Sequence, residues 1–271
     1  MPEPAIAVEG LTKVFAGSGI GRRSAETVAV SDVSFEVDAG AAFAIVGESG
    51  SGKTTVARCL AGLETLTNGT IEVCGERLAG TGSSRAERLR RARMIQLVFQ
   101  DPYQSLDPRQ PVGSALAEAI SLHRPKGEAT EKAVVSLLER VGLSAKIIDS
   151  YPRVLSGGQR QRVAIARALA AGPEAIVFDE SVSALDVSIQ AQVLNLIADL
   201  RESDGVTTIF ISHDLAVVSQ VSDTMIVMRR GEVVEAGATD EILASPSHPY
   251  TQRLIASVPH IGWDPEKLLA Q

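Results

Sequence analysis

The stretch AAFAIVGESGSGKTTVARCLA (residues 41–61) predicts a strand, a glycine-rich loop and a helix in direct succession. The apolar run Ala42–Val46 is the predicted strand, and the turn from Gly47 to Gly52 leads into a helical pattern. The loop fits G-x-x-x-x-G-K-[ST] at every fixed position, with Lys53 and Thr54 completing the motif. Chance produces such spacing in roughly one chain in a hundred of this length. The strand-to-helix context further favours a phosphate-binding loop over an incidental glycine-rich turn.

Glycines at these positions let successive backbone N–H groups turn inward around phosphate oxygens, and the helix N-terminus adds positive potential. Lys53 is expected to reach the β- and γ-phosphates, and the Thr54 hydroxyl to ligate Mg²⁺. The residues expected around the phosphates are Gly47, Glu48, Ser49, Gly50, Ser51, Gly52, Lys53, Thr54 and Thr55. We therefore expect the chain to bind a nucleoside triphosphate together with Mg²⁺.

Length and composition bound the remaining possibilities. A chain of 271 residues suits one large domain, or one domain with a subdomain. No apolar stretch approaches the ~20 residues of a membrane span, and the first ten residues lack the pattern of a secretory signal. The net charge of −7 and the pI near 5.2 argue against nucleic acid as the main partner. These features favour a cytoplasmic location.

The two cysteines are predicted to be structural. Cys59 falls in the helix predicted after the phosphate loop, and Cys74 falls in a predicted strand. Both are therefore interpreted as small core residues rather than a disulfide or a metal pair.

Strand and helix patterns alternate along the rest of the chain, which predicts an α/β protein with a mainly parallel sheet. A glycine- and arginine-rich loop is expected at 16–27, and a largely helical insertion from about Arg85 to Tyr151. The basic run within Gly80–Arg93 is interpreted as a solvated helix face or a contact to an acidic neighbour, in preference to a nucleic-acid site. Strands are predicted at Ile6–Phe15, Val28–Val37, Met94–Phe99, Ala175–Phe178 and Val206–Ser212, after a turn at Asn68–Gly69, and as a hairpin across Thr224–Ala236; helices are predicted at Val112–Ile120, Gly127–Val141, Val187–Leu200 and over most of Thr239–Ser257.

Three features fall at the carboxyl ends of predicted parallel strands, where open sheets bind their ligands. They are the phosphate loop, the pair Asp179-Glu180 and His213. Adjacent residues at a strand end point to opposite sides. One carboxylate can therefore hold Mg²⁺ while the other polarises an attacking water.

The segment Leu155-Ser156-Gly157-Gly158-Gln159 precedes the helical pattern RQRVAIARALA, with Ser156 placed as the N-cap. This segment resembles the signature motif of ATP-binding cassette (ABC) ATPases. It occurs in the family's order, after the phosphate loop and before the acidic pair and the histidine. The resemblance runs from about Ile6 to Ser257.

Carried over position by position, the resemblance implies roles for individual residues. Asp179 supports Mg²⁺ together with Thr54 and Gln100, and Glu180 is the general base. The implied catalytic residues are Glu180, His213, Lys53 and Gln100, and the implied nucleotide contacts outside the phosphate loop are Phe15, Gln100, Ser156, Gly157, Gly158, Gln159, Asp179 and Asp186. Phe15 would stack on adenine, His213 would contact the γ-phosphate, and residues 183–186 would form a loop across a dimer interface.

The same resemblance implies an architecture and partners. The fold would combine a mainly parallel core sheet, an N-terminal antiparallel β subdomain, a helical subdomain at about 85–165 and a C-terminal tail at about 239–271, within one ABC ATPase domain over 1–271. Because the family completes each site with the signature motif of an opposite subunit, a second ATPase subunit is implied, either a second copy or a paralogue. Transmembrane permease subunits would hold the pair at the cytoplasmic face of the membrane. An extracytoplasmic solute-binding protein would be an indirect partner, acting through the permease.

Two further stretches narrow the resemblance. FQDPYQSLDPR (99–109) and SPSHPYTQRLIASVP (245–259) resemble ATPases of the oligopeptide, dipeptide and nickel uptake group. Peptide is the preferred solute, with nickel or another chelated metal as the alternative. A non-transport ABC ATPase is the alternative function from a different functional class. Two positions depart from the common pattern, since Val154 precedes the signature leucine and Ser181 follows Glu180. The histidine-proline-tyrosine turn at 248–250 is interpreted as a surface turn that informs ancestry more than mechanism.

Overall fold

A computed structural model describes residues 4–16, 26–78, 84–123, 131–183 and 185–257. Most of the loop expected at 16–27, the first residues of the helix expected at 127–141, Ala184 and the end of the tail beyond residue 257 lie outside the described residues.

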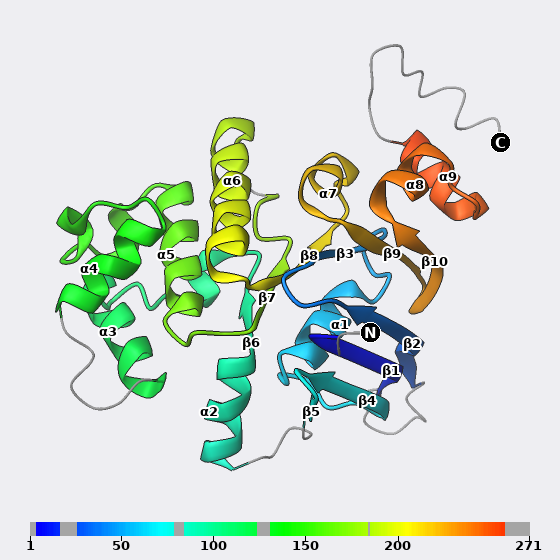
Figure 1. Ribbon diagram of the computed structural model, residues 1–271, viewed down its shortest axis with the longest axis horizontal. Coiled ribbons are helices and arrows are strands. Elements are labelled where there is room, and N and C mark those ends of the chain that lie inside the picture. Colours follow the sequence, from blue (N-terminus) through cyan, green and yellow to red (C-terminus); the bar gives the residue numbers. More distant parts are fainter. Residues whose placement is uncertain (1–3, 17–25, 79–83, 124–130, 184, 258–271) are drawn as a thin grey trace, which may run out of the picture.

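A six-stranded sheet forms the centre of the molecule (Figure 1), in the order β10-β9-β3-β8-β7-β6. Its strands are β3 (Ala42–Val46), β6 (Ile95–Val98), β7 (Ala175–Asp179), β8 (Thr207–Ser212), β9 (Thr224–Arg229) and β10 (Glu232–Ala238). All neighbours pair in parallel except β9 and β10, which form the predicted antiparallel hairpin. The predicted α/β class with a mainly parallel sheet is confirmed.

Strand β3 is buried on both faces of this sheet, and its side chains alternate between two hydrophobic clusters. Phe43 and Ile45 face the cluster that includes α1 (Lys53–Leu60), whereas Ala44 and Val46 face the cluster under the helices of the other side. A strand buried on both faces is expected to be apolar without interruption. The run Ala42–Val46 meets that condition, since all five residues are buried.

A second, antiparallel sheet packs on the α1 side, in the order β2-β1-β4-β5. It contains β1 (Ile6–Phe15), β2 (Thr27–Val37), β4 (Asn68–Val73) and β5 (Glu76–Arg77). The rings of Phe35 on β2 and Phe43 on β3 stack with centroids 4.9 Å apart, which joins the two sheets. The predicted turn at Asn68–Gly69 is wrong in extent, because β4 already begins at Asn68 and pairs there with Thr12 of β1.

The largely helical segment comprises α2 (Arg85–Met94), α3 (Val112–His123), α4 (Glu131–Arg140) and α5 (Gly157–Leu169), with short 3₁₀ turns at Pro102–Gln104, Ala145–Ile147 and Pro152–Val154. Figure 1 shows α3, α4 and α5 packed together at one side of the central sheet. Strand β6 lies inside the range predicted for the helical subdomain, yet it pairs with β7 as the edge of the central sheet.

The basic run on α2 differs in part from its prediction. Arg90 forms an ion pair with Glu76 at 3.0 Å, in keeping with a contact to an acidic neighbour. Arg91 is instead buried, and its Nη1 donates to the carbonyl of Gly62 at 3.3 Å. Burial lowers the pKa of Arg91. A charge pattern alone does not reveal which arginine of a helix faces the protein.

The C-terminal third places α6 (Val187–Asp204) and α7 (Leu215–Val221) against the central sheet and ends with α8 (Thr239–Ala244) and α9 (Pro249–Ala256) beside β10. Within the described ranges, no helix has the length and apolar character needed to cross a membrane.

The two cysteines occupy different environments. Cys59 is buried on α1, as predicted, and burial raises the pKa of its thiol to about 11. The prediction for Cys74 is wrong, because this residue is exposed in the turn after β4, with a positive φ of 50°. The apolar run ends at Val73, and the chain reverses there before β5.

Candidate nucleotide-binding site

The phosphate loop leaves the carboxyl end of β3 and enters α1, as the motif predicts. Gly47 has φ 151° and Gly52 has φ 105°, a region that favours glycine. A Cβ at Gly47 would lie 2.3 Å from the carbonyl oxygen of Met228, and one at Gly52 would lie 2.5 Å from that of Ala29. Both glycines are therefore required by close backbone packing as well as by conformation.

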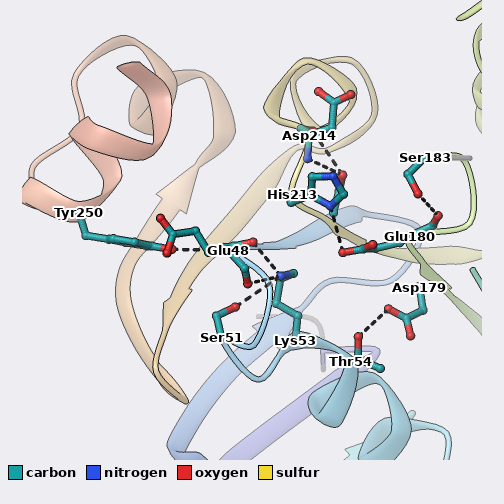
Figure 2. Close-up of polar contacts among 12 residues, drawn as sticks. Glu48, Ser51, Lys53, Thr54, Asp179, Glu180, Ser183, His213, Asp214 and Tyr250 are labelled. Atoms are coloured by element: carbon teal, nitrogen blue, oxygen red, sulfur yellow. Dashed lines mark hydrogen bonds and ion pairs between the residues drawn. The ribbon is translucent and has the colours of Figure 1, made fainter. Parts of the chain in front are cut away.

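Lys53 lies folded across this loop (Figure 2). Its Nζ donates to the carbonyl oxygens of Gly47 at 2.7 Å and Glu48 at 2.8 Å, and to Ser51 Oγ at 3.4 Å. Burial lowers the pKa of Lys53, while the charges of Glu180 and Asp179 act in the opposite direction. A buried ammonium group held by neutral carbonyls is poised to bind an anion.

A cavity of about 400 Å³ opens beside the loop. Its lining contains five of the predicted residues, Gly50, Gly52, Lys53, Thr54 and Thr55, together with Thr27, Val28, Ala29 and Arg230. The last four were missed by sequence reasoning. They come from β2 and from the turn between β9 and β10, and no motif in the sequence marks either segment.

Thr54 and Asp179 meet beside this cavity, where Thr54 Oγ1 donates to Asp179 Oδ1 at 3.2 Å. Burial raises the pKa of Asp179, and the Thr54 hydrogen bond partly offsets this effect. A hydroxyl and a carboxylate at this distance are hard oxygen donors of the kind Mg²⁺ prefers, with water and phosphate oxygens completing its shell. The donor set therefore fits a magnesium nucleotide.

Glu180 points away from Asp179 and toward His213 (Figure 2). Its Oε1 lies 3.1 Å from His213 Nδ1. The backbone of Glu180 has the positive φ of 47°, held by its N–H bond to the Ile211 carbonyl at 2.9 Å and by Ser183 Oγ, which donates to the Glu180 carbonyl at 2.8 Å. Neighbouring carboxylates thus have separate partners, as their positions at the end of β7 predict. The contribution of Ser183 was not anticipated.

Gln100 and Phe15 lie outside the lining of the cavity. Gln100 is exposed just beyond β6, at the same edge of the sheet as Asp179 on the neighbouring strand. Phe15 is 38% exposed at the end of β1, where it pairs with Thr27 of the cavity lining and lies under Lys13, whose Nζ is 4.7 Å from the ring centroid. Neither residue is among those that line the cavity.

The signature segment builds a second polar surface at the start of α5. Ser156 Oγ accepts the Gln159 N–H at 3.2 Å, and the Gln159 side chain accepts the Ser156 N–H at 2.9 Å, which makes a capping box. The predicted N-cap is thereby confirmed. Gly158 is buried against Ile189, and Gly157 faces Leu185.

Asp186 caps α6 beside this segment by accepting the Ile189 N–H at 3.0 Å. That bond, with one from Ser188, lowers the pKa of Asp186. The signature segment and the segment around Asp186 are therefore packed together, but neither contributes to the cavity at the phosphate loop. The chain therefore carries two separate polar surfaces, one at the phosphate loop and one at the signature segment.

One contact to the phosphate loop was missed altogether. The backbone N–H of Glu48 donates to the hydroxyl of Tyr250 on α9 at 3.0 Å (Figure 2). Tyr250 belongs to the histidine-proline-tyrosine turn, and the prediction of a surface turn is wrong at this residue, because its exposed fraction is only 3%.

Comparison with known proteins agrees with this geometry. A family model described as ABC transporter matches residues 30–183, and one described as oligopeptide/dipeptide transporter, C-terminal region, matches residues 234–270. A solved dimeric ATP-binding cassette, MJ0796 in a post-hydrolysis state bound to ADP and Pi, is similar to the chain with a TM-score of 0.73 and 28% identity. The similarity covers 86% of this chain and 98% of that one.

Curated relatives resemble nearly the whole chain. It is 45% identical over 260 residues to the glutathione import ATP-binding protein GsiA of Salmonella typhi, a match covering 95% of this chain and 41% of GsiA. It is 42% identical over 267 residues to the di/tripeptide transport ATP-binding protein DppF of Pseudomonas aeruginosa, covering 98% of this chain and 82% of DppF. The chain therefore spans less than half the length of GsiA.

Proposed function

Since the chain belongs to the ABC transporter family, we propose that it is the ATP-binding and ATP-hydrolysing subunit of an importer for oligopeptides or dipeptides. The observation that carries the proposal is the alignment of a complete phosphate loop, Asp179, Glu180 and His213 along the carboxyl edge of one parallel sheet. The similarity to DppF and GsiA supports a peptide as the solute.

The proposed reaction is attack of water on the γ-phosphorus of ATP, in line with the bond to the leaving oxygen of ADP. Glu180 takes a proton from the attacking water, and His213 holds the Glu180 carboxylate in place. Lys53 moves from the loop carbonyls to the phosphates and, with the loop amides, stabilises the charge that develops. The products are ADP and inorganic phosphate.

Thr54 and Asp179 would hold Mg²⁺, with Gln100 reaching it from the end of β6. When bound, the ion would neutralise part of the charge on the β- and γ-phosphates. The raised pKa of Asp179 supports such a role, because burial disfavours the charged carboxylate and a bound cation would favour it.

The two separate polar surfaces support a dimer. The N-terminus of α5 offers the Ser156 hydroxyl and the positive end of the helix dipole, which together suit a phosphate. Because the cavity at the phosphate loop has no contribution from this helix, the proposed active form pairs two ATPase subunits, each completing the site of the other.

We further propose that permease subunits hold this pair at the cytoplasmic face of the membrane, with a solute-binding protein outside. The test is uptake of a radiolabelled dipeptide by cells that lack the gene. Restoration by the wild-type gene and not by Glu180→Gln is the expected result. Undiminished dipeptide uptake in the deletion strain would contradict the peptide assignment, and loss of nickel uptake instead would favour a metal.

A further inference from the structure

We propose that Tyr250 is a positioning residue for the phosphate loop, through which the C-terminal segment (residues 245–256) controls the affinity for ATP. The inference rests on the proposed function, because it concerns the same nucleotide site. It starts from the hydrogen bond in which the Glu48 N–H donates to the Tyr250 hydroxyl at 3.0 Å, across 202 positions of sequence.

The position of the Tyr250 hydroxyl is fixed by packing. Tyr250 is the second residue of α9, and its ring belongs to the large hydrophobic cluster on one face of the central sheet. The guanidinium of Arg229 at the end of β9 lies over the ring, with Cζ 5.1 Å from the centroid. The hydroxyl therefore reaches the loop from a rigid base, since a tyrosine has only two rotatable side-chain bonds and both are restricted here.

The turn before α9 is fastened to the sheet as well. Glu235 on β10 accepts the N–H of Ser247 at 2.7 Å with one carboxylate oxygen and that of His248 at 3.2 Å with the other. His248 Nδ1 then accepts the N–H of Tyr250 at 3.1 Å and caps the helix. The C-terminal segment is thus tied to the hairpin β9–β10 at several points, and Tyr250 extends that connection to the phosphate loop.

Glu48 is the residue where this connection meets the catalytic lysine. Its N–H donates to Tyr250, and its carbonyl accepts a hydrogen bond from Lys53 Nζ at 2.8 Å. When Lys53 turns to the phosphates, the hydroxyl of Tyr250 remains as a fixed anchor for that part of the loop. A loop that is ordered before binding loses less entropy when it closes around phosphate oxygens. Tyr250 should therefore strengthen ATP binding without touching the nucleotide.

Tyr250→Phe keeps the ring and removes only the hydroxyl. From the net strength of one neutral hydrogen bond, we expect the Kd of the full chain for Mg²⁺-ATP to rise about threefold to tenfold. Hydrogen exchange of the peptide that spans residues 44–55 should become faster in the absence of nucleotide. Tyr151→Phe is the matched control, because Tyr151 lies 37% exposed on the helical segment, and it should change neither measurement.

A double-mutant cycle with Glu48→Pro tests whether the hydroxyl acts through the Glu48 N–H, which proline lacks. In that background Tyr250→Phe should have no further effect on the Kd. An undiminished effect in that background would overturn the proposal, and so would an unchanged Kd and exchange rate in the single variant. Should Glu48→Pro fail to fold, the hydrogen-exchange rate of Tyr250→Phe compared with that of Tyr151→Phe decides whether the proposal holds.

The ATP-binding measurement also distinguishes a failure of the proposed function from a failure of the role of Tyr250. Failure of the wild-type chain to bind ATP would overturn the proposed function itself. Tight ATP binding by both the wild type and Tyr250→Phe would leave the proposed function intact and overturn only the role of Tyr250.

Discussion

His213 Nδ1 lies 3.1 Å from Glu180 Oε1, although 33 positions separate the two residues. They become neighbours because β7 and β8 pair in parallel, with Asp179 opposite Ile211, so that both strands end at the same edge of the sheet. The left-handed conformation of Glu180 turns its side chain to this histidine. Non-glycine residues in that region cost about 1–3 kcal/mol and tend to occur at functional sites.

Glu180→Gln should abolish turnover while leaving ATP binding intact. The substitution removes the carboxylate proposed to take a proton and leaves Lys53, Thr54 and the loop glycines in place. We expect a loss in kcat of at least about a hundredfold, since general bases contribute about 10²–10⁴. Phosphate release measured beside ATP binding checks this, and near-normal hydrolysis would refute the assignment of Glu180.

The same variant should reveal how the two polar surfaces meet. If two copies pair through the signature segment and the phosphate loop, the molar mass of Glu180→Gln should double on addition of Mg²⁺-ATP, because bound ATP is not consumed. Light scattering with and without nucleotide measures this. A variant that binds ATP and stays monomeric would point to a paralogous subunit as the partner and exclude a stable homodimer under those conditions.

Two adjacent glycines of the signature segment should respond differently to alanine. A Cβ at Gly158 would lie 2.4 Å from Ile189 Cγ2, whereas one at Gly157 would lie 3.5 Å from Leu185 Cδ2, an ordinary contact. Overpacking of this kind costs about 1–3 kcal/mol. Gly158→Ala should therefore lower the free energy of unfolding by about that amount in denaturant titrations, with Gly157→Ala as its control. Equal stability of the two variants would contradict the packing against Ile189.

The two cysteines should differ in their reaction with iodoacetamide. The thiolate is the reactive form, and burial raises the pKa of Cys59 to about 11, so that at pH 8 roughly one Cys59 thiol in a thousand is ionised. Cys74 is exposed. Mass spectrometry of the native protein at pH 8 should find Cys74 alkylated and Cys59 unmodified, and both should react in denaturant. Rapid native labelling of Cys59 would contradict its burial.

The sequence by itself determined the elements whose causes are local. The apolar run before Gly47 makes a strand, and the glycines make the loop. Ser156 caps α5 through a hydrogen bond that spans only three residues. The parallel order of the strands then places Asp179, Glu180 and His213 at the edge where the loop lies. The strand, loop and cap predictions succeeded because each depends on backbone conformation within a few residues. The placement of the three polar side chains succeeded because parallel strands end at the same edge of a sheet.

Only the tertiary structure decided which surfaces meet. Arg91 is buried because of how α2 packs against the core, which no local pattern encodes. Tyr250 reaches Glu48 for the same reason, since α9 packs beside the hairpin β9–β10 and places the Tyr250 hydroxyl against the phosphate loop. Capping and periodicity are short-range effects, whereas contacts between distant segments depend on the shapes of whole packed layers.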